Sequence, residues 1–173
     1  MRRPAPIILT ALMGQADFAM MEGLRTRHFP PERNVVPAHI SLFHHLPPSR
    51  LDDLLRMMRS ACAGPPPIAR LSDVMLLGRG VGFRVESPDL LAIRGEIADA
   101  FPYELIPQDQ HTPRLHITVQ NKVTAAEAKA LHAQLSAQFR PRPISIIGLA
   151  AWHYLDGPWQ LAAQVKFRGR GQR

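Results

Sequence analysis

The chain has 173 residues, 46% of them hydrophobic, with a single cysteine and 21 basic against 14 acidic side chains. These values fit one domain over residues 1–173, or two small lobes that share a core, and they exclude a disordered chain, an internal disulfide and a cysteine-based zinc site. The longest apolar stretch near the start, residues 7–13, is far shorter than the roughly 20 residues that cross a bilayer, so we expect a cytoplasmic protein with no membrane partner.

Short strands and helices alternate along the chain, and prolines and glycines mark most of their ends. In the first half we expect a strand over 6–13, a helix over 17–28, a strand over 36–43, a helix over 51–63, and strands over 68–77 and 81–86. In the second half we expect a helix from 88 to about 101, a polar loop over 108–114, a strand over 115–123, a helix over 125–139, and strands over 143–154 and 159–167. Both halves run helix, strand, helix, strand, turn, strand, which predicts a duplicated α+β fold.

Two tetrapeptides share one pattern and lie on corresponding strands of the two halves, His39-Ile40-Ser41-Leu42 and His116-Ile117-Thr118-Val119. In an extended strand, residues i and i+2 share a face. Each strand therefore turns a histidine and a hydroxyl residue to one side and two aliphatic residues to the core. Two such pairs indicate two equivalent half-sites that face each other across one cleft. This arrangement suits acid–base chemistry on an oxyanion such as a phosphodiester.

In such a site, one imidazole takes a proton from the attacking oxygen and the other gives a proton to the leaving oxygen. The hydroxyl groups of Ser41 and Thr118 would donate hydrogen bonds to the non-bridging oxygens, where negative charge builds up. Run in reverse, the same site would join a cyclic phosphate end to a 5′-hydroxyl. The sequence fixes neither the direction nor which histidine is the base.

Strand alternation also adds three candidate substrate contacts. Arg114 and Lys122 share the face of His116, and His45 shares the face of His39 if that strand runs far enough. The neighbouring His44 raises the question of a metal cluster, but no nearby carboxylate completes a zinc site, so we expect no metal. Four aromatic residues either stack on a nucleobase or pack in the core, and the sequence leaves both open: Phe43, Trp152, Tyr154 and Trp159.

The two tetrapeptides resemble the paired His-x-Ser/Thr-x motifs of the 2H phosphoesterases, the group that contains bacterial 2′-5′ RNA ligases and cyclic nucleotide phosphodiesterases. The resemblance covers essentially the whole chain. It implies a bilobal α+β fold of antiparallel sheets with flanking helices, pseudo-twofold symmetry and a central cleft. It also implies metal-independent chemistry without a cofactor, catalytic roles for His39 and His116, and phosphate binding by Ser41 and Thr118.

We therefore expect a monomeric, metal-independent phosphodiesterase that acts on 2′,3′-cyclic or 2′-5′ linked RNA and nucleotide phosphodiesters. Three alternatives stay open: an RNA ligase that runs the reverse reaction, an RNA-binding module without turnover, and a histidine-rich metal-dependent hydrolase. The net charge of +7, nearly all of it from arginine, fits a polyanionic partner such as RNA, and it equally fits a solvated basic surface.

Overall fold

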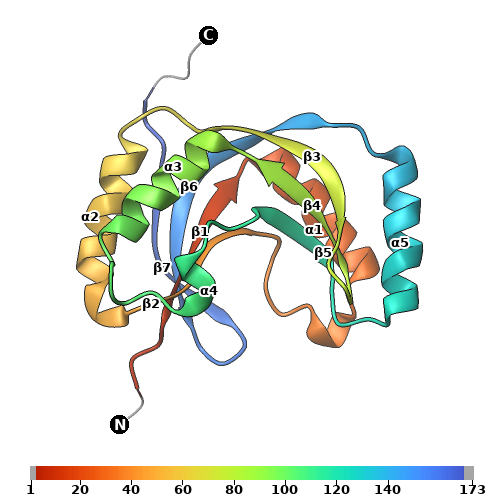
Figure 1. Ribbon diagram of the computed structural model, residues 1–173, viewed down its shortest axis with the longest axis horizontal. Coiled ribbons are helices and arrows are strands. Elements are labelled where there is room, and N and C mark those ends of the chain that lie inside the picture. Colours follow the sequence, from red (N-terminus) through yellow and green to blue (C-terminus); the bar gives the residue numbers. More distant parts are fainter. Residues whose placement is uncertain (1–2, 170–173) are drawn as a thin grey trace.

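The computed structural model describes residues 3–169, and its strands form one curved sheet (Figure 1). The seven strands are β1 (Ile7–Met13), β2 (Ile40–Leu46), β3 (Ile68–Leu76), β4 (Val81–Glu86), β5 (His116–Gln120), β6 (Arg142–Tyr154) and β7 (Trp159–Lys166). Their order is β2-β1-β6-β3-β4-β5, with β7 paired to β6, and the pairs are antiparallel. The predicted α+β class with antiparallel strands and flanking helices is confirmed.

The helices are α1 (Gln15–His28), α2 (Leu51–Cys62), α3 (Pro88–Asp99), α4 (Pro107–Gln110) and α5 (Ala125–Gln138). Side chains cap two of them, because Ser87 Oγ accepts a hydrogen bond from the Leu90 amide and Thr124 Oγ1 accepts one from the Glu127 amide, both at 3.1 Å. The short helix α4 lies where the sequence predicted a loop, since four residues are too few to show an apolar period.

The long strand β6 joins two halves of the sheet. Its first residues pair with β3, and its later residues pair with β1 and β7. One half therefore contains β2, β1, β7 and the end of β6, and the other contains β3, β4, β5 and the start of β6. Figure 1 shows α2 and α3 beside the first half and α1 and α5 beside the second.

The motif strands β2 and β5 stand at opposite ends of the strand order, and yet they contact each other. The sheet achieves this by curving into an arch (Figure 1). The two motifs, which are far apart in the sequence, consequently lie side by side.

The aliphatic residues of both motifs lie in the core. Ile40, Leu42, Ile117 and Val119 are all 0% exposed, as the alternation predicted. Cys62 is also buried, and its thiol donates a hydrogen bond to a carbonyl of β7 at 3.6 Å. Across residues 3–169, no helix is both long enough and apolar enough to cross a membrane.

Candidate active site

A single cleft between the two motif strands collects the side chains that the motifs singled out. It has a volume of about 520 Å³. Its lining residues are His39, Ser41, His44, Met75, Gln108, Pro113, Arg114, His116, Thr118 and Trp159. The structure thus brings both histidines and both hydroxyl residues of the motifs into one site.

The two motif histidines make equivalent hydrogen bonds. His39 Nδ1 lies 2.7 Å from the carbonyl oxygen of Pro37, and His116 Nδ1 lies 2.7 Å from the carbonyl oxygen of Arg114. A carbonyl only accepts, so each Nδ1 carries the proton and donates it. Each Nε2 is then left to accept a proton when the ring is neutral, or to donate one when the ring is charged.

Two buried arginines support the motif strands in a matching way. Arg25 of α1 donates from Nη1 to the Thr118 carbonyl at 2.8 Å, and Arg94 of α3 donates from Nε to the Leu42 carbonyl at 3.3 Å. Each guanidinium also lies within about 4.4 Å of the centre of a phenylalanine ring. In each half of the chain, one helix therefore provides an arginine that hydrogen-bonds to the motif strand of the other half.

The surroundings of His39 make it harder to protonate. Burial is the main cause that lowers the pKa of His39 to about 4, and the charges of Arg25 and of two neighbouring histidines lower it further. The hydrogen bond to a backbone carbonyl works in the opposite direction but is outweighed. The ring of Trp159 packs against the imidazole, with centroids 4.7 Å apart and planes inclined by 58°. His39 is therefore neutral near pH 7.

The cleft suits an anion. Within residues 3–169, no aspartate or glutamate side chain lines it, whereas three histidines and Arg114 do. The Arg114 guanidinium supplies donors for phosphate oxygens, and a positive charge without an opposing carboxylate attracts anionic ligands.

A family model of the 2'-5' RNA ligase superfamily matches residues 14–158. The chain belongs to this superfamily. The resemblance to the 2H phosphoesterases is confirmed by this match together with the solved structures that share the fold. No curated protein matches the chain.

Several solved structures share the fold at low sequence identity. TT0787 of Thermus thermophilus is 17% identical, with a TM-score of 0.62 over 96% of this chain and 100% of that one. E. coli LigT complexed with 3'-AMP is 16% identical, with a TM-score of 0.61 over 98% and 100% of the two chains. A structure described as a phosphoesterase is 15% identical, with a TM-score of 0.59 over 95% and 99%. All three show that this chain has the fold of the family.

A β-bulge in β2 decides which neighbouring histidine faces the cleft. One step along β1 corresponds to two steps on β2, from Ser41 to Phe43. As a result Leu42 and Phe43 are both 0% exposed, and His44 takes the cleft side. His45 is exposed and lies outside the cleft, which corrects its predicted placement: strict alternation does not continue through a bulge.

The second motif strand has a bulge at the corresponding place. Gly82 of β4 pairs with Thr118, and the next residue of β4 toward the turn pairs with Gln120, which is buried at 6% exposure. The strand ends there, and Lys122 adopts a positive φ of 61°. Lys122 therefore also lies outside the cleft, contrary to its predicted placement, whereas Arg114 lines the cleft as expected.

Of the four aromatic residues that the sequence left open, Trp159 is the one that lines the cleft. Phe43 is buried in the core, and Trp152 donates from Nε1 to Thr10 Oγ1 at 2.9 Å. Tyr154 is 39% exposed and lies outside the cleft. No periodicity in the sequence distinguishes Trp159, because its position depends on how the last hairpin folds toward His39.

An apolar cavity of about 460 Å³ adjoins the cleft and shares His39 and Trp159 with it. Phe18, Val35 and Ile147 line this cavity, and they are 37%, 63% and 38% exposed, respectively. A concave apolar surface beside a polar reaction site is a common way to hold the uncharged part of a ligand, such as a nucleobase.

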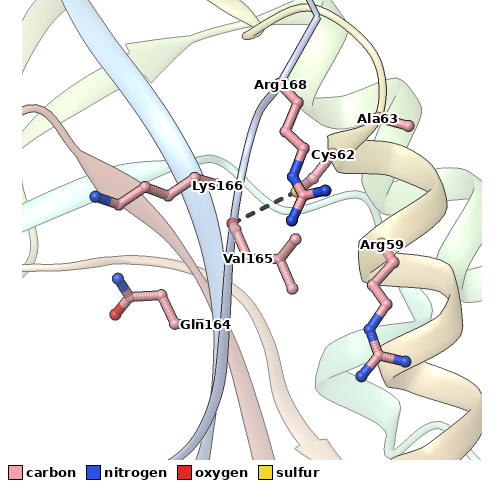
Figure 2. A pocket seen from close by; sticks show the side chains of 7 residues that line it. All are labelled: Arg59, Cys62, Ala63, Gln164, Val165, Lys166 and Arg168. Carbon is pink, nitrogen blue, oxygen red and sulfur yellow. Dashed lines mark hydrogen bonds between the residues drawn. The ribbon is translucent and has the colours of Figure 1, made fainter.

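A separate cavity of about 620 Å³ lies between α2 and β7 (Figure 2). Arg59 and Arg168 point toward it, whereas Gln164 and Lys166 extend to the other side of β7 (Figure 2). Within the part of the chain that the structure describes, the residues lining this cavity carry positive charge, and no histidine is among them. Size alone therefore does not mark the reaction site, since the acid–base groups gather in the smaller cleft.

Among residues 3–169, no group of three or more histidine, cysteine, aspartate or glutamate side chains is in position to hold a metal ion. His44 and His45 diverge, because His44 faces the cleft and His45 faces solvent. The described residues thus offer no ligand set for the metal site that the adjacent histidines suggested.

Proposed function

We propose that this protein is a phosphodiesterase that opens 2′,3′-cyclic phosphates, or cleaves 2′-5′ linkages, at the end of RNA or on a nucleotide. The observation that carries the proposal is the matched pair of histidines. His39 and His116 each donate Nδ1–H to a carbonyl two residues earlier, so both Nε2 atoms serve the same cleft. Two imidazoles arranged in this way supply the base and the acid of an in-line displacement at phosphorus.

From the neutral state of His39 we propose the roles of the two histidines in the hydrolytic direction. His39 is neutral, so its Nε2 takes a proton from the attacking water, whose oxygen forms a bond to phosphorus. The bond from phosphorus to one ribose oxygen breaks, and His116 gives that oxygen a proton. Ser41 and Thr118 donate hydrogen bonds to the non-bridging oxygens as their charge increases. Both proton transfers are made by side chains, so the reaction needs no metal.

The same groups serve ligation, in which a 5′-hydroxyl of RNA takes the place of water as the nucleophile on the cyclic phosphate. Each histidine keeps its role, because His39 takes the proton of the 5′-hydroxyl and His116 gives a proton to the same departing ribose oxygen. The family description includes RNA ligation, and the charge of +7 favours an RNA end over a small uncharged substrate.

The pH dependence of the reaction reports the state of His39. A base must be neutral to act, so we expect kcat/KM to stay high from pH 7 down to about pH 5 and to fall below the pKa of about 4. Measuring kcat/KM for a 2′,3′-cyclic nucleotide between about pH 3.5 and 8 would check this expectation. An acidic limb near pH 6.5, the ordinary value for histidine, would contradict the assignment of His39 as a buried base.

The lowered pKa of His39 also makes the stability of the fold depend on pH, so the kinetic measurement needs a control for unfolding. Because His39 has a lower pKa in the folded than in the unfolded state, its contribution to stability is complete above about pH 6.5 and is lost as the pH falls toward about 4. The loss amounts to about 3 kcal/mol. Circular dichroism at each pH would separate unfolding from titration of the base.

The direct test of the proposed function is a ring-opening assay on a 2′,3′-cyclic nucleotide and on an oligonucleotide with a cyclic phosphate end. We expect a linear monophosphate, and the position of its phosphate shows which bond breaks. Binding of the oligonucleotide without ring opening would instead favour an RNA-binding module, with an affinity that falls steeply as salt is added.

A further inference from the structure

A third histidine of the cleft is held by a buried carboxylate. His44 Nδ1 lies 3.0 Å from Oδ1 of Asp109, and the carboxylate also accepts the backbone amides of His44 at 3.0 Å and of His45 at 2.9 Å. Asp109 is 1% exposed. Burial would raise the pKa of Asp109, but these hydrogen bonds outweigh it and lower the pKa below its ordinary value. An ionised carboxylate therefore stands behind the His44 ring.

The position of Asp109 is itself fixed. Arg94 of α3 donates from Nη2 to the Asp109 carbonyl and from Nε to the Leu42 carbonyl, so one buried guanidinium ties α4 to β2. The same guanidinium lies over the ring of Phe43, 4.3 Å from its centre. The His44 ring is thus held in a set orientation, as a preorganised binding group should be.

This orientation leaves Nε2 of His44 free to serve the cleft. Nδ1 is engaged by the carboxylate, and His44 lines the cleft together with Arg114 and Gln108. The charged groups around the ring are Asp109 from α4, Arg94 from α3 and Arg114 from the cleft, and the titratable His39 also faces it. Of these, Asp109 makes the direct contact, and an Nε2–H on a ring held in this way would donate to an anion in the cleft.

The proposed reaction uses two histidines of the cleft, so the His44 imidazole and the Arg114 guanidinium are nitrogen groups of the cleft that it leaves unused. We propose that His44, together with Arg114, forms a second anion subsite that binds a second phosphate of the substrate, on the 5′ side of the reacting nucleotide. This inference rests on the proposed function, which places the reacting phosphate between His39 and His116. The substrate would accordingly be a 5′-phosphorylated nucleotide or an RNA end.

Binding measurements test the subsite without requiring turnover. The probes are 3′-AMP, adenosine 3′,5′-bisphosphate, and a dinucleotide that ends in 3′-phosphoadenosine. Calorimetry would give their dissociation constants for the parent protein, H44Q, H44F and the control H45Q, which replaces the exposed neighbour of His44. The bisphosphate carries a terminal 5′-phosphate, whereas the dinucleotide carries a phosphodiester at that position. Comparing their dissociation constants therefore shows whether the subsite prefers a 5′-phosphorylated nucleotide or an RNA end.

We expect the parent and H45Q to bind at least one two-phosphate probe about tenfold more tightly than 3′-AMP, the gain of one charge-assisted hydrogen bond. In H44Q and H44F this preference should shrink to less than about twofold. Equal binding of all probes by the parent, or a preference that survives in H44Q, would overturn the subsite. A preference kept by H44F but lost by H44Q would also overturn it, because ring stacking rather than charge would then be responsible.

The outcome is separable from that of the proposed function. A parent that opens cyclic phosphates but shows no preference for a second phosphate contradicts the subsite alone. A parent that shows the preference but opens no cyclic phosphate contradicts the reaction and supports the subsite.

Discussion

Replacing His116 by alanine should lower kcat for ring opening of a 2′,3′-cyclic nucleotide by about 10²–10⁴-fold, and replacing His39 should have an effect of the same size. Each substitution removes one proton transfer and leaves Ser41 and Thr118 to bind the phosphate, so KM should change far less than kcat. Steady-state kinetics of the two variants would measure both constants. The matched control is His111→Ala, which removes an exposed histidine outside the cleft.

The double variant adds a second readout. Because the two histidines act in one reaction step, removing both should cost much less than the product of the two single losses. If either single variant kept more than about a tenth of the parent activity, that histidine would not be the base or the acid of the reaction.

Replacing Arg25 by methionine should lower the free energy of unfolding by about 2–3 kcal/mol. Methionine keeps apolar volume but removes the donors to the Thr118 carbonyl and to Asn34 Oδ1, so both part-buried acceptors lose a charge-assisted hydrogen bond. Removing the positive charge should also raise the pKa of His39, which Arg25 helps to lower. The acidic limb of kcat/KM should therefore move to higher pH. Denaturant unfolding and a pH–rate profile would measure the two effects.

Arg27→Met provides the control for Arg25, because Arg27 lies on the same helix with an exposed side chain. We expect it to change neither the stability by more than about 0.5 kcal/mol nor the acidic limb. A loss of stability in the Arg25 variant without movement of the acidic limb would contradict the electrostatic contribution of Arg25 to the site.

Sequence patterns predicted the parts of the fold that depend on local periodicity. The strands, the long helices and the buried aliphatic residues of both motifs follow from alternation and helical spacing. The bulges after Ser41 and Thr118 interrupt that alternation, and no residue in the motifs is of a type that predicts a bulge. They account for the misplacement of His45 and Lys122.

The sequence did not predict the site contacts between residues far apart in the chain, and the reason is different. Asp109 supplies the carboxylate beside His44 from a segment 65 residues away, and Arg25 reaches Thr118 across 93 residues. In the sequence Asp109 belongs to a polar loop and Arg25 to the charged positions of a helix. Their roles appear only when the curved sheet brings its two edges together.

The most direct test of a metal-independent, two-histidine phosphodiesterase is ring opening of a 2′,3′-cyclic nucleotide by the parent protein after dialysis against EDTA, with EDTA kept in the assay. We predict turnover at the rate of the untreated protein. Loss of turnover in EDTA that is restored by adding a divalent metal would contradict the proposed mechanism.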